Sequence, residues 1–356
     1  MFGDGMEHRN STSLTSSGSL ERSFTGLVGT VAHEFFHSWN MERIRGAALE
    51  PFDLEKAVMS GELWFGEGFT NYYGQLALAR AGLIPAEDFI RREGGTIDAV
   101  VNGPGRRFFS PIEMSMQAPF VDAAVSVDAT NLTNTFISYY TYGEFLALAL
   151  DLTLRTRPGE LKLDDFMRAV WLRHGRVEIP FTVDDLEREL GELTKDPAFA
   201  SDFFARYVRG REVPDMAPLL ARAGIRLHPA NAGMPIVTRA RLALIEGGLL
   251  VDGPTIVGDP LYQAGLDRGD VVTRVGGARI DTVGALERGL EGKRPGDVVE
   301  VEWQGRGASH RAHVTLAESP TLTATPEEIL AGGRLGDAER AFRTRWLRSR
   351  AAELVR

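Results

Sequence analysis

The segment whose residue types and spacing best suit catalysis is His33-Glu34-Phe35-Phe36-His37. On a helix, positions i and i+4 lie on one face, so both imidazole rings can bind the same metal ion. Glu34 follows His33 directly and can act as the general base for a water molecule at that ion. A chance pentapeptide is the alternative, but two histidines in a strongly apolar helix are costly unless they are hydrogen-bonded or bind a ligand. The segment therefore predicts a zinc site.

A catalytic zinc ion needs a third protein ligand and leaves one position open. The most common spacings after the motif do not supply that ligand, because positions 40, 43 and 56 hold Asn, Arg and Lys. Glu55 lies in a polar linker, and Glu62 sits at the start of a helix, where a carboxylate usually interacts with the helix dipole. Glu67 lies within the apolar run of residues 63–69 without a basic neighbour, which is typical of a ligand. We expect Glu67 to be the third ligand, with Glu62 as the alternative.

The composition excludes several classes of site and partner. The chain has 356 residues, a net charge of −9 and no cysteine, so disulfides, thiolate zinc sites and a cysteine nucleophile are excluded. The negative charge argues against general nucleic-acid binding, which needs a basic surface. No apolar run approaches the roughly 18 to 20 residues of a membrane-spanning helix. Residues 1–5 have neither the basic region nor the apolar stretch of a signal peptide.

The elements that must position these groups are helices in the first part of the chain. Residues 23–39 form an apolar helix that carries both histidines and, because it is apolar on nearly all sides, is expected to be buried. A second apolar helix over residues 60–81 carries Glu67. After about residue 222, short runs separated by Gly, Pro and Asp indicate β-strands. Further helices are expected over residues 86–101, 136–156 and 197–209, and from about residues 163 and 182.

A helix with this motif, followed by a helix with Trp-Phe-Gly-Glu-Gly-Phe, resembles the gluzincin aminopeptidases. The longer string HEFFHSWN…RIRG…PFD…LWFGEGFTNYY resembles the glycyl aminopeptidase family of zinc metallopeptidases, whose members carry a C-terminal PDZ domain. In that family more residues separate the second histidine from the glutamate than in most gluzincins, and the 29 residues between His37 and Glu67 fit this pattern. The resemblance covers nearly the whole chain. It implies one zinc ion bound by His33, His37 and Glu67, with Glu34 as the general base.

The same resemblance implies roles for two further residues. Gluzincin aminopeptidases place a catalytic tyrosine in a Y-x-K-G motif, and alignment on Gly143 makes Tyr140 that residue, which donates a hydrogen bond to the oxyanion. Tyr142 replaces the lysine of the motif, so Tyr139 is a rival. The G-M-E-H segment around Glu7 is similar to the gluzincin G-x-M-E-N stretch, which implies that Glu7 binds the α-ammonium group of the substrate.

The C-terminal β region carries its own resemblance. Residues 258–272 (GDPLYQAGLDRGDVV) resemble the G-S-P-A-x-x-A-G-L-x-x-G-D-x-I stretch of bacterial PDZ domains, which bind an extended peptide or a C-terminus beside a strand. The carboxylate-binding loop expected near residues 244–250 is not clearly matched, so a packing or regulatory role is the alternative. Beyond this region, Thr325-Pro326-Glu327-Glu328 predicts the start of a helical tail.

Together these features predict a multidomain α+β protein. We expect a mainly α-helical, thermolysin-like gluzincin catalytic domain over residues 1–221, a PDZ domain over 222–320 and a helical tail over 321–356. The expected function is zinc-dependent hydrolysis of the first peptide bond of peptides with a free N-terminus, and the resemblance implies a preference for N-terminal Gly or Ala. A zinc endopeptidase and a catalytically incomplete PDZ-bearing scaffold are the alternatives.

The family's β-rich N-terminal domain is missing from this sequence. We therefore expect the chain to be the back portion of a larger enzyme. Its compartment stays open: cytoplasmic for the chain as given, and periplasmic if a targeting segment precedes it.

Overall fold

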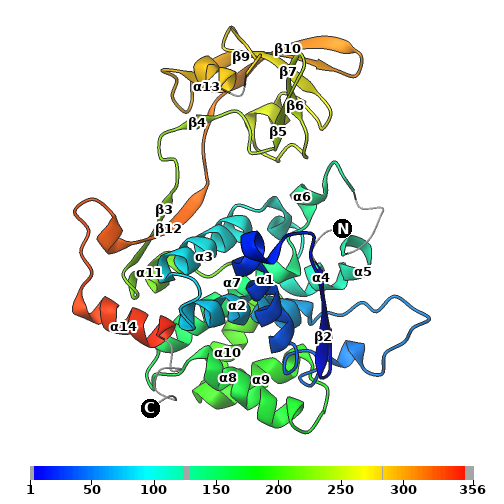
Figure 1. Ribbon diagram of the computed structural model, residues 1–356, viewed down its shortest axis with the longest axis vertical. Helices are drawn as coiled ribbons and strands as arrows, with labels where there is room; N and C mark the ends of the chain where they lie inside the picture. Colours follow the sequence, from blue (N-terminus) through cyan, green and yellow to red (C-terminus); the bar gives the residue numbers. More distant parts are fainter. Residues whose placement is uncertain (1–3, 123–127, 283, 349–356) are drawn as a thin grey trace.

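A computed structural model describes residues 4–122, 128–282 and 284–348. A helical first half is followed by an antiparallel β-rich region, and Figure 1 shows the two as separate masses joined by a narrow pair of strands. The α+β class predicted from the sequence is therefore confirmed, whereas the division of the chain at residues 222 and 321 remains a prediction. Each mass has its own hydrophobic core. None of the described helices combines the length and hydrophobicity needed to cross a bilayer.

The elements follow one another along the chain with short 3₁₀ and π segments between some of them. The described α-helices are α1 (Leu20–Phe36), α2 (Leu63–Arg80), α3 (Ala86–Val101), α4 (Pro111–Met116), α5 (Ala118–Val121), α6 (Leu132–Thr135), α7 (Tyr139–Thr156), α8 (Leu163–Val170), α9 (Val183–Thr194), α10 (Pro197–Phe203), α11 (Met216–Ala221), α12 (Pro260–Gln263), α13 (Ala285–Leu290) and α14 (Asp337–Leu347). The described strands are β1 (Asp4–His8), β2 (Ser11–Thr15), β3 (Ile225–Pro229), β4 (Pro235–Ile236), β5 (Leu242–Ile245), β6 (Gly248–Val251), β7 (Val271–Val275), β8 (Ala278–Arg279), β9 (Val298–Gly305), β10 (Ala308–Thr315), β11 (Ala317–Glu318) and β12 (Leu322–Pro326).

Helices α2 and α7 form the centre of the helical half. α7 is buried along nearly its whole length and packs directly on α2. The two backbones come close because glycines meet at the contact. A Cβ atom at Gly68 would lie 2.2 Å from Gly143 Cα, and a Cβ atom at Gly143 would lie 1.8 Å from the carbonyl oxygen of Trp64. This crossing places the helix that carries Glu67 against the first turn of α7.

The N-terminal ribbon and α1 are more exposed than the sequence predicted. β1 pairs antiparallel with β2, whose side chains are all exposed. In α1 only Gly29 and Glu34 are buried, while Leu20, Phe24 and Phe35 are more than half exposed. The expectation of a buried helix was therefore wrong. Its main packing partners among the described residues are α2 and the ribbon, so much of its apolar surface is left uncovered.

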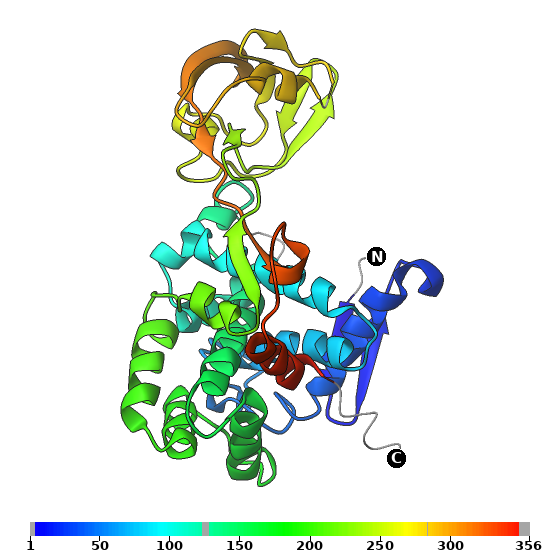
Figure 2. The same cartoon turned by 90° about the vertical axis from the view of Figure 1, so that its left-hand side faces the viewer.

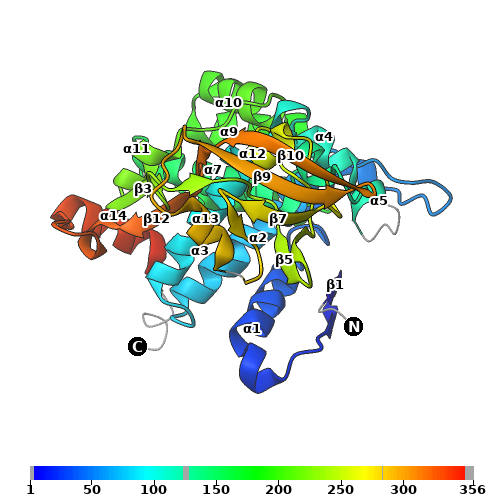
Figure 3. The ribbon, with the colours of Figure 1, turned by 90° about the horizontal axis from the view of Figure 1, so that it is seen from above.

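The β-rich region is a six-stranded antiparallel sheet. Its strands run in the order β10–β9–β7–β6–β5, and β8 pairs with β7 beside this path. Val251, Val275 and Val301 are fully buried in its core. Seen from above, β9 and β10 lie across the molecule (Figure 3), and the side view shows the strands curving around a common centre (Figure 2).

Two strands connect this sheet to the helical half. β3 pairs antiparallel with β12 from Ile225↔Pro326 to Pro229↔Leu322. β12 lies on α3, where a Cβ atom at Gly94 would be 2.6 Å from the amide nitrogen of Ala324. The predicted helical start at Thr325 is therefore wrong, because pairing with the distant β3 makes this segment a strand. The helix of the predicted tail is α14, and residues 349–356 lie outside the described residues.

A second contact joins the two masses near α6. Asn134 is buried, and its Nδ2 donates to the carbonyl oxygen of Thr255 at 2.8 Å. Its Oδ1 accepts from the amide of Val257 at 2.9 Å. The β-rich region therefore contacts the segment that leads into α7, as well as being held by β3 and β12.

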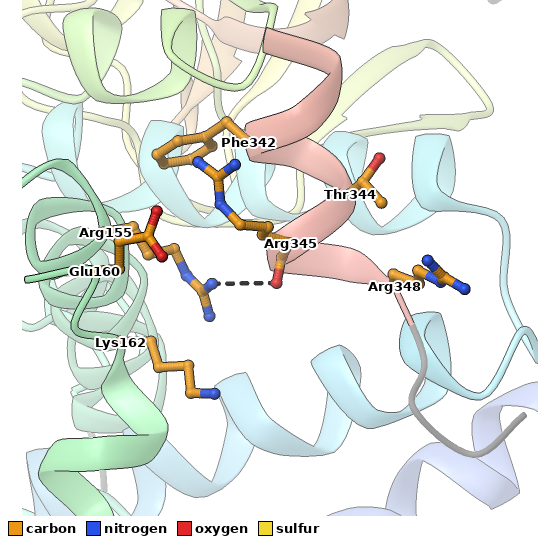
Figure 4. A pocket seen from close by; sticks show the side chains of 7 residues that line it. All are labelled: Arg155, Glu160, Lys162, Phe342, Thr344, Arg345 and Arg348. Carbon is orange, nitrogen blue, oxygen red and sulfur yellow. Dashed lines mark hydrogen bonds between the residues drawn. The ribbon is translucent and has the colours of Figure 1, made fainter. Parts of the chain in front are cut away.

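Helix α14 docks on the helical half through a buried hydrogen-bond network. Trp346 Nε1 donates to the Tyr72 hydroxyl at 2.9 Å, and this hydroxyl donates to Oδ2 of Asp151 at 2.7 Å. Arg155 donates from Nε to the other Asp151 oxygen at 2.9 Å and from Nη1 to the Arg345 carbonyl at 3.2 Å. Figure 4 shows this last bond at the edge of a cavity of about 290 Å³ between α7 and α14. None of the predicted site residues lines that cavity.

Candidate metal centre

Helices α1 and α2 bring the three predicted metal ligands to one point. His33 and His37 lie one turn apart at the end of α1, and their Nε2 atoms are 2.9 Å from each other. Each of these atoms is 3.3 Å from Oε2 of Glu67 on α2. The three side chains are between 2% and 15% exposed, so the cluster is largely shielded from solvent.

The bonding of these atoms fits a bound cation. Oε2 of Glu67 is buried and has no hydrogen bond of good geometry, although two ring nitrogens lie within ion-pair distance. All three ligand atoms lie within 4.8 Å of one another. Two imidazole nitrogens and one carboxylate oxygen that lie this close together are a ligand set typical of catalytic zinc. The residues present therefore fit the metal ion that the sequence predicted.

The charges of the cluster favour a positive occupant. Burial acts to raise the pKa of Glu67, but its contacts with His33 and His37 dominate and lower that pKa to about 2. Burial acts to lower the pKa of His37, but its contacts with Glu67 raise that pKa to about 9. The ionised Glu67 carboxylate thus holds a proton on the imidazole beside it. A divalent cation can take the place of that proton, because metal ligands must be deprotonated.

Glu34 lies beside the cluster with a free carboxylate oxygen. The residue is buried, and its Oε2 has no hydrogen-bond partner. Burial raises the pKa of Glu34 above its ordinary value, and the two histidines partly offset this effect. A carboxylate with a raised pKa near a reacting water suits proton transfer in both directions.

Strand β1 brings Glu7 to the same place. Glu7, Glu34 and His37 each offer one ligand-type atom, and these atoms lie within 4.8 Å of one another. The backbone of β1 approaches closely because Gly5 has no side chain: a Cβ atom there would lie 2.1 Å from Oε1 of Glu34. A residue of β1 therefore contributes a second carboxylate beside the candidate metal centre.

Tyr139 and Tyr140 have different surroundings at the start of α7. The Tyr139 hydroxyl donates to Oδ2 of Asp122 at 2.6 Å, so its proton is already engaged. The Tyr140 ring lies against the His33 ring, with centroids 6.1 Å apart and planes inclined by 23°. Burial, followed by the charge of Glu67, raises the pKa of Tyr140 well above its ordinary value, so its hydroxyl keeps its proton.

The remaining sequence candidates lie apart from the ligand cluster. Oε2 of Glu62 accepts from the Ser60 hydroxyl at 2.7 Å, and this carboxylate is not among the groups that could hold a metal in the described residues. No pattern in the sequence indicated a role for Asn40. This residue is buried, and its main-chain carbonyl oxygen is 2.9 Å from Nδ1 of His37. A polar residue just after a helix usually faces solvent, so its type alone gave no signal.

Residues 26–146 match the family model described as M61 glycyl aminopeptidase, and this segment includes both histidines, Glu34, Glu67 and Tyr140. The crystal structure of an aminopeptidase N family protein from Idiomarina loihiensis is similar, with a TM-score of 0.80 and 25% sequence identity. The match covers 97% of this chain and 60% of that one, so the chain spans less than two thirds of its relative. A search of curated proteins found no match. Over residues 26–146 the chain is therefore similar to the M61 glycyl aminopeptidases, a family of metallo-aminopeptidases.

Proposed function

We propose that this chain is a zinc-dependent aminopeptidase that hydrolyses the first peptide bond of its substrates. The observation that carries the proposal is the convergence of His33, His37 and Glu67 on one point, with the unpartnered carboxylate oxygen of Glu34 beside it. The similarity of residues 26–146 to a family of metallo-aminopeptidases supports the same activity.

His33, His37 and Glu67 would hold the zinc ion, which when bound polarises the scissile carbonyl group and acidifies a water molecule. Glu34 accepts the proton of the attacking water on its carboxylate and then passes it to the leaving amine. The raised pKa of Glu34 supports both halves of this transfer, because the group must bind the proton and also release it.

Tyr140 and Glu7 act on the substrate itself. The Tyr140 hydroxyl donates a hydrogen bond to the oxyanion as negative charge develops there, and a donor of this kind contributes roughly 3 to 4 kcal/mol. Its position beside His33 and its retained proton support this role. The carboxylate of Glu7 binds the α-ammonium group of the substrate, so that only the first peptide bond reaches the water and Glu34.

The substrate preference and the domain organisation complete the proposal. The resemblance to glycyl aminopeptidases supports small N-terminal residues such as Gly or Ala. We propose a gluzincin catalytic domain over residues 1–221, a PDZ domain over 222–320 and a helical tail beyond. The antiparallel sheet supports the PDZ assignment, and in the described structure β5 pairs only with β6, which leaves an edge beside which an extended peptide could bind.

The test measures zinc content and peptide hydrolysis on the same purified chain. We expect one zinc ion per chain and hydrolysis of glycyl or alanyl anilides that a chelator abolishes and zinc restores. Glu34→Gln should keep the zinc and lose hydrolysis, because it removes the proton acceptor and leaves the three ligands in place.

Three outcomes would contradict parts of this proposal. Zinc retained in a His33→Ala, His37→Ala double variant would show that the ligands are wrong. Equal cleavage of a peptide and its N-acetylated form would identify an endopeptidase and remove the role of Glu7. Stoichiometric zinc without any hydrolysis would favour a peptide-binding scaffold.

A further inference from the structure

The turn that follows α1 lies against the helix that carries Glu67. Backbone hydrogen bonds close this turn: Glu42 N donates to His37 O at 3.1 Å, and Ile44 N donates to Trp39 O at 2.7 Å. Asn40, inside the turn, is fully buried. A buried amide usually finds hydrogen-bond partners, and those of Nδ2 show what the turn is fixed to, whereas Oδ1 has none among the described residues.

The main chain of Asn40 fixes the ring of His37. Its carbonyl oxygen is 2.9 Å from Nδ1 of His37 and accepts the proton on that nitrogen. A proton on Nδ1 leaves the lone pair on Nε2, which is the atom that faces His33 and Glu67. This bond therefore sets both the tautomer and the orientation that a metal ligand needs.

The side chain of the same residue is bonded to α2 on either side of Glu67. Nδ2 of Asn40 lies 3.1 Å and 3.0 Å from the carbonyl oxygens of Phe65 and Gly66. It also lies 3.2 Å from the Thr70 hydroxyl, which itself donates to the Gly66 carbonyl. Three acceptors around one atom require the nitrogen end of the amide there. The bonds set the position and rotation of the first turns of α2.

The backbone conformation and packing of Met41 show that the turn is held tightly against α2. Met41 has a φ of 98°, a conformation that is costly for a residue with a side chain and that surrounding contacts must offset. Its side chain occupies the space beside Gly66, where a Cβ atom would lie 2.1 Å from Met41 Sδ. The residue just before Glu67 is thus a glycine, and the absence of a side chain there leaves room for Met41.

We infer that Asn40 is a positioning residue that sets His37 and Glu67 relative to each other. Its main-chain carbonyl group orients the His37 ring, and its side-chain amide fixes the position of α2, the helix that carries Glu67. In this role Asn40 acts through His37 and Glu67. This inference deepens the proposed function and rests on the metal site formed by His33, His37 and Glu67.

The test compares metal binding in Asn40→Ala with a matched control. The control is Ser115→Ala, because Ser115 is also buried and also fixes the start of α2, accepting from Trp64 N at 2.9 Å, but has no bond to His37. Zinc affinity is measured by competition with a chromophoric chelator. The visible spectrum of the Co²⁺-loaded protein reports ligand geometry, and the unfolding temperature of the metal-free protein reports the structural cost.

Asn40→Ala is expected to weaken zinc binding about 10- to 100-fold and to shift the Co²⁺ spectrum, as losses of groups that orient metal ligands do. Ser115→Ala should lower the unfolding temperature and leave zinc affinity and the spectrum unchanged. If Asn40→Ala does not fold, Thr70→Val removes one of the three acceptors with little change in shape and should weaken zinc binding about 2- to 10-fold.

The outcomes separate this inference from the proposed function. A wild-type chain that binds no zinc would overturn both. A wild type that binds zinc, with an Asn40→Ala variant or, failing that, a Thr70→Val variant of the same affinity and spectrum, would overturn the inference alone. An equal loss of affinity in Ser115→Ala would also overturn it, because the effect would then follow from any loosening of α2.

Discussion

Replacing Tyr72 by Phe should lower the stability of the protein, because it removes a hydroxyl group that is hydrogen-bonded to two buried side chains. The hydroxyl donates to Asp151 at 2.7 Å and accepts from Trp346 Nε1 at 2.9 Å, and all three residues are buried. A hydrogen bond to a charged group contributes about 1.5 to 3 kcal/mol, and a buried donor left without a partner costs about 1 to 3 kcal/mol. The aromatic ring remains, so no cavity opens. Because Asp151 keeps its bonds from Arg155 and Leu163, we expect a loss near the lower end of the sum, about 3 kcal/mol.

Urea unfolding followed by tryptophan fluorescence measures this loss, with Tyr73→Phe as the matched control. Tyr73 lies on the same helix as Tyr72, and its hydroxyl donates to Asp164 of α8 at 3.0 Å. The Asp164 side chain is 34% exposed, so water can replace the hydroxyl. The control should lose less than about 1 kcal/mol. Equal losses in the two variants would refute the reasoning, because the network beneath α14 would then contribute no more than a surface hydrogen bond.

Three further results are expected. Tyr140→Phe should lower kcat about 100-fold or more, as loss of an oxyanion donor does, while Tyr139→Phe keeps kcat within about threefold; steady-state kinetics on an alanyl anilide compares them. Burial, followed by the charge of Glu144, raises the pKa of Glu93 well above its ordinary 4.5. The folded state then keeps a proton that the unfolded state releases, so stability present below about pH 4.5 is lost as pH rises toward the folded pKa, by up to about 1.4 kcal/mol per pH unit. Glu93→Gln should make this slope shallower in chemical denaturation above about pH 5, and an unchanged slope would contradict the assignment. Gly68→Ala should cost about 3 kcal/mol in the same assay, because its new methyl group meets the backbone of α7.

The sequence predicted the parts of the site that depend on local geometry. His33 and His37 meet because helical spacing alone puts them on one face, and both lie on the predicted helix. Glu67 was separable from Glu62 because a carboxylate in an apolar run needs a partner, and the structure brings Glu67 to the histidines. The α+β class followed from the change in hydrophobic period after about residue 222.

What the sequence could not predict depends on contacts between distant segments. The apolar content of α1 indicated burial, but it did not indicate which element would cover the helix. Phe24 and Phe35 are in fact exposed. The local sequence at Thr325 is typical of a helix start, but pairing with the distant strand β3 makes this segment a strand. Asn40 acts through acceptors 25 and more residues away, which no local pattern reveals.

Strands β3 and β12 have a consequence for the path of the chain. Pro229 and Leu322 are partners in the ladder, so their Cα atoms lie roughly 5 Å apart, and the chain leaves the helical half and re-enters it at one point. Everything between them is an excursion from the tip of a hairpin. A two-residue turn joins partners at that separation, so a short turn could close the chain in place of the excursion, at the cost of its hydrogen bonds with Asn134. The excursion is held by two chain crossings and by the contact with Asn134, so it cannot swing as on a single tether. One cut in either strand would leave it attached by the other.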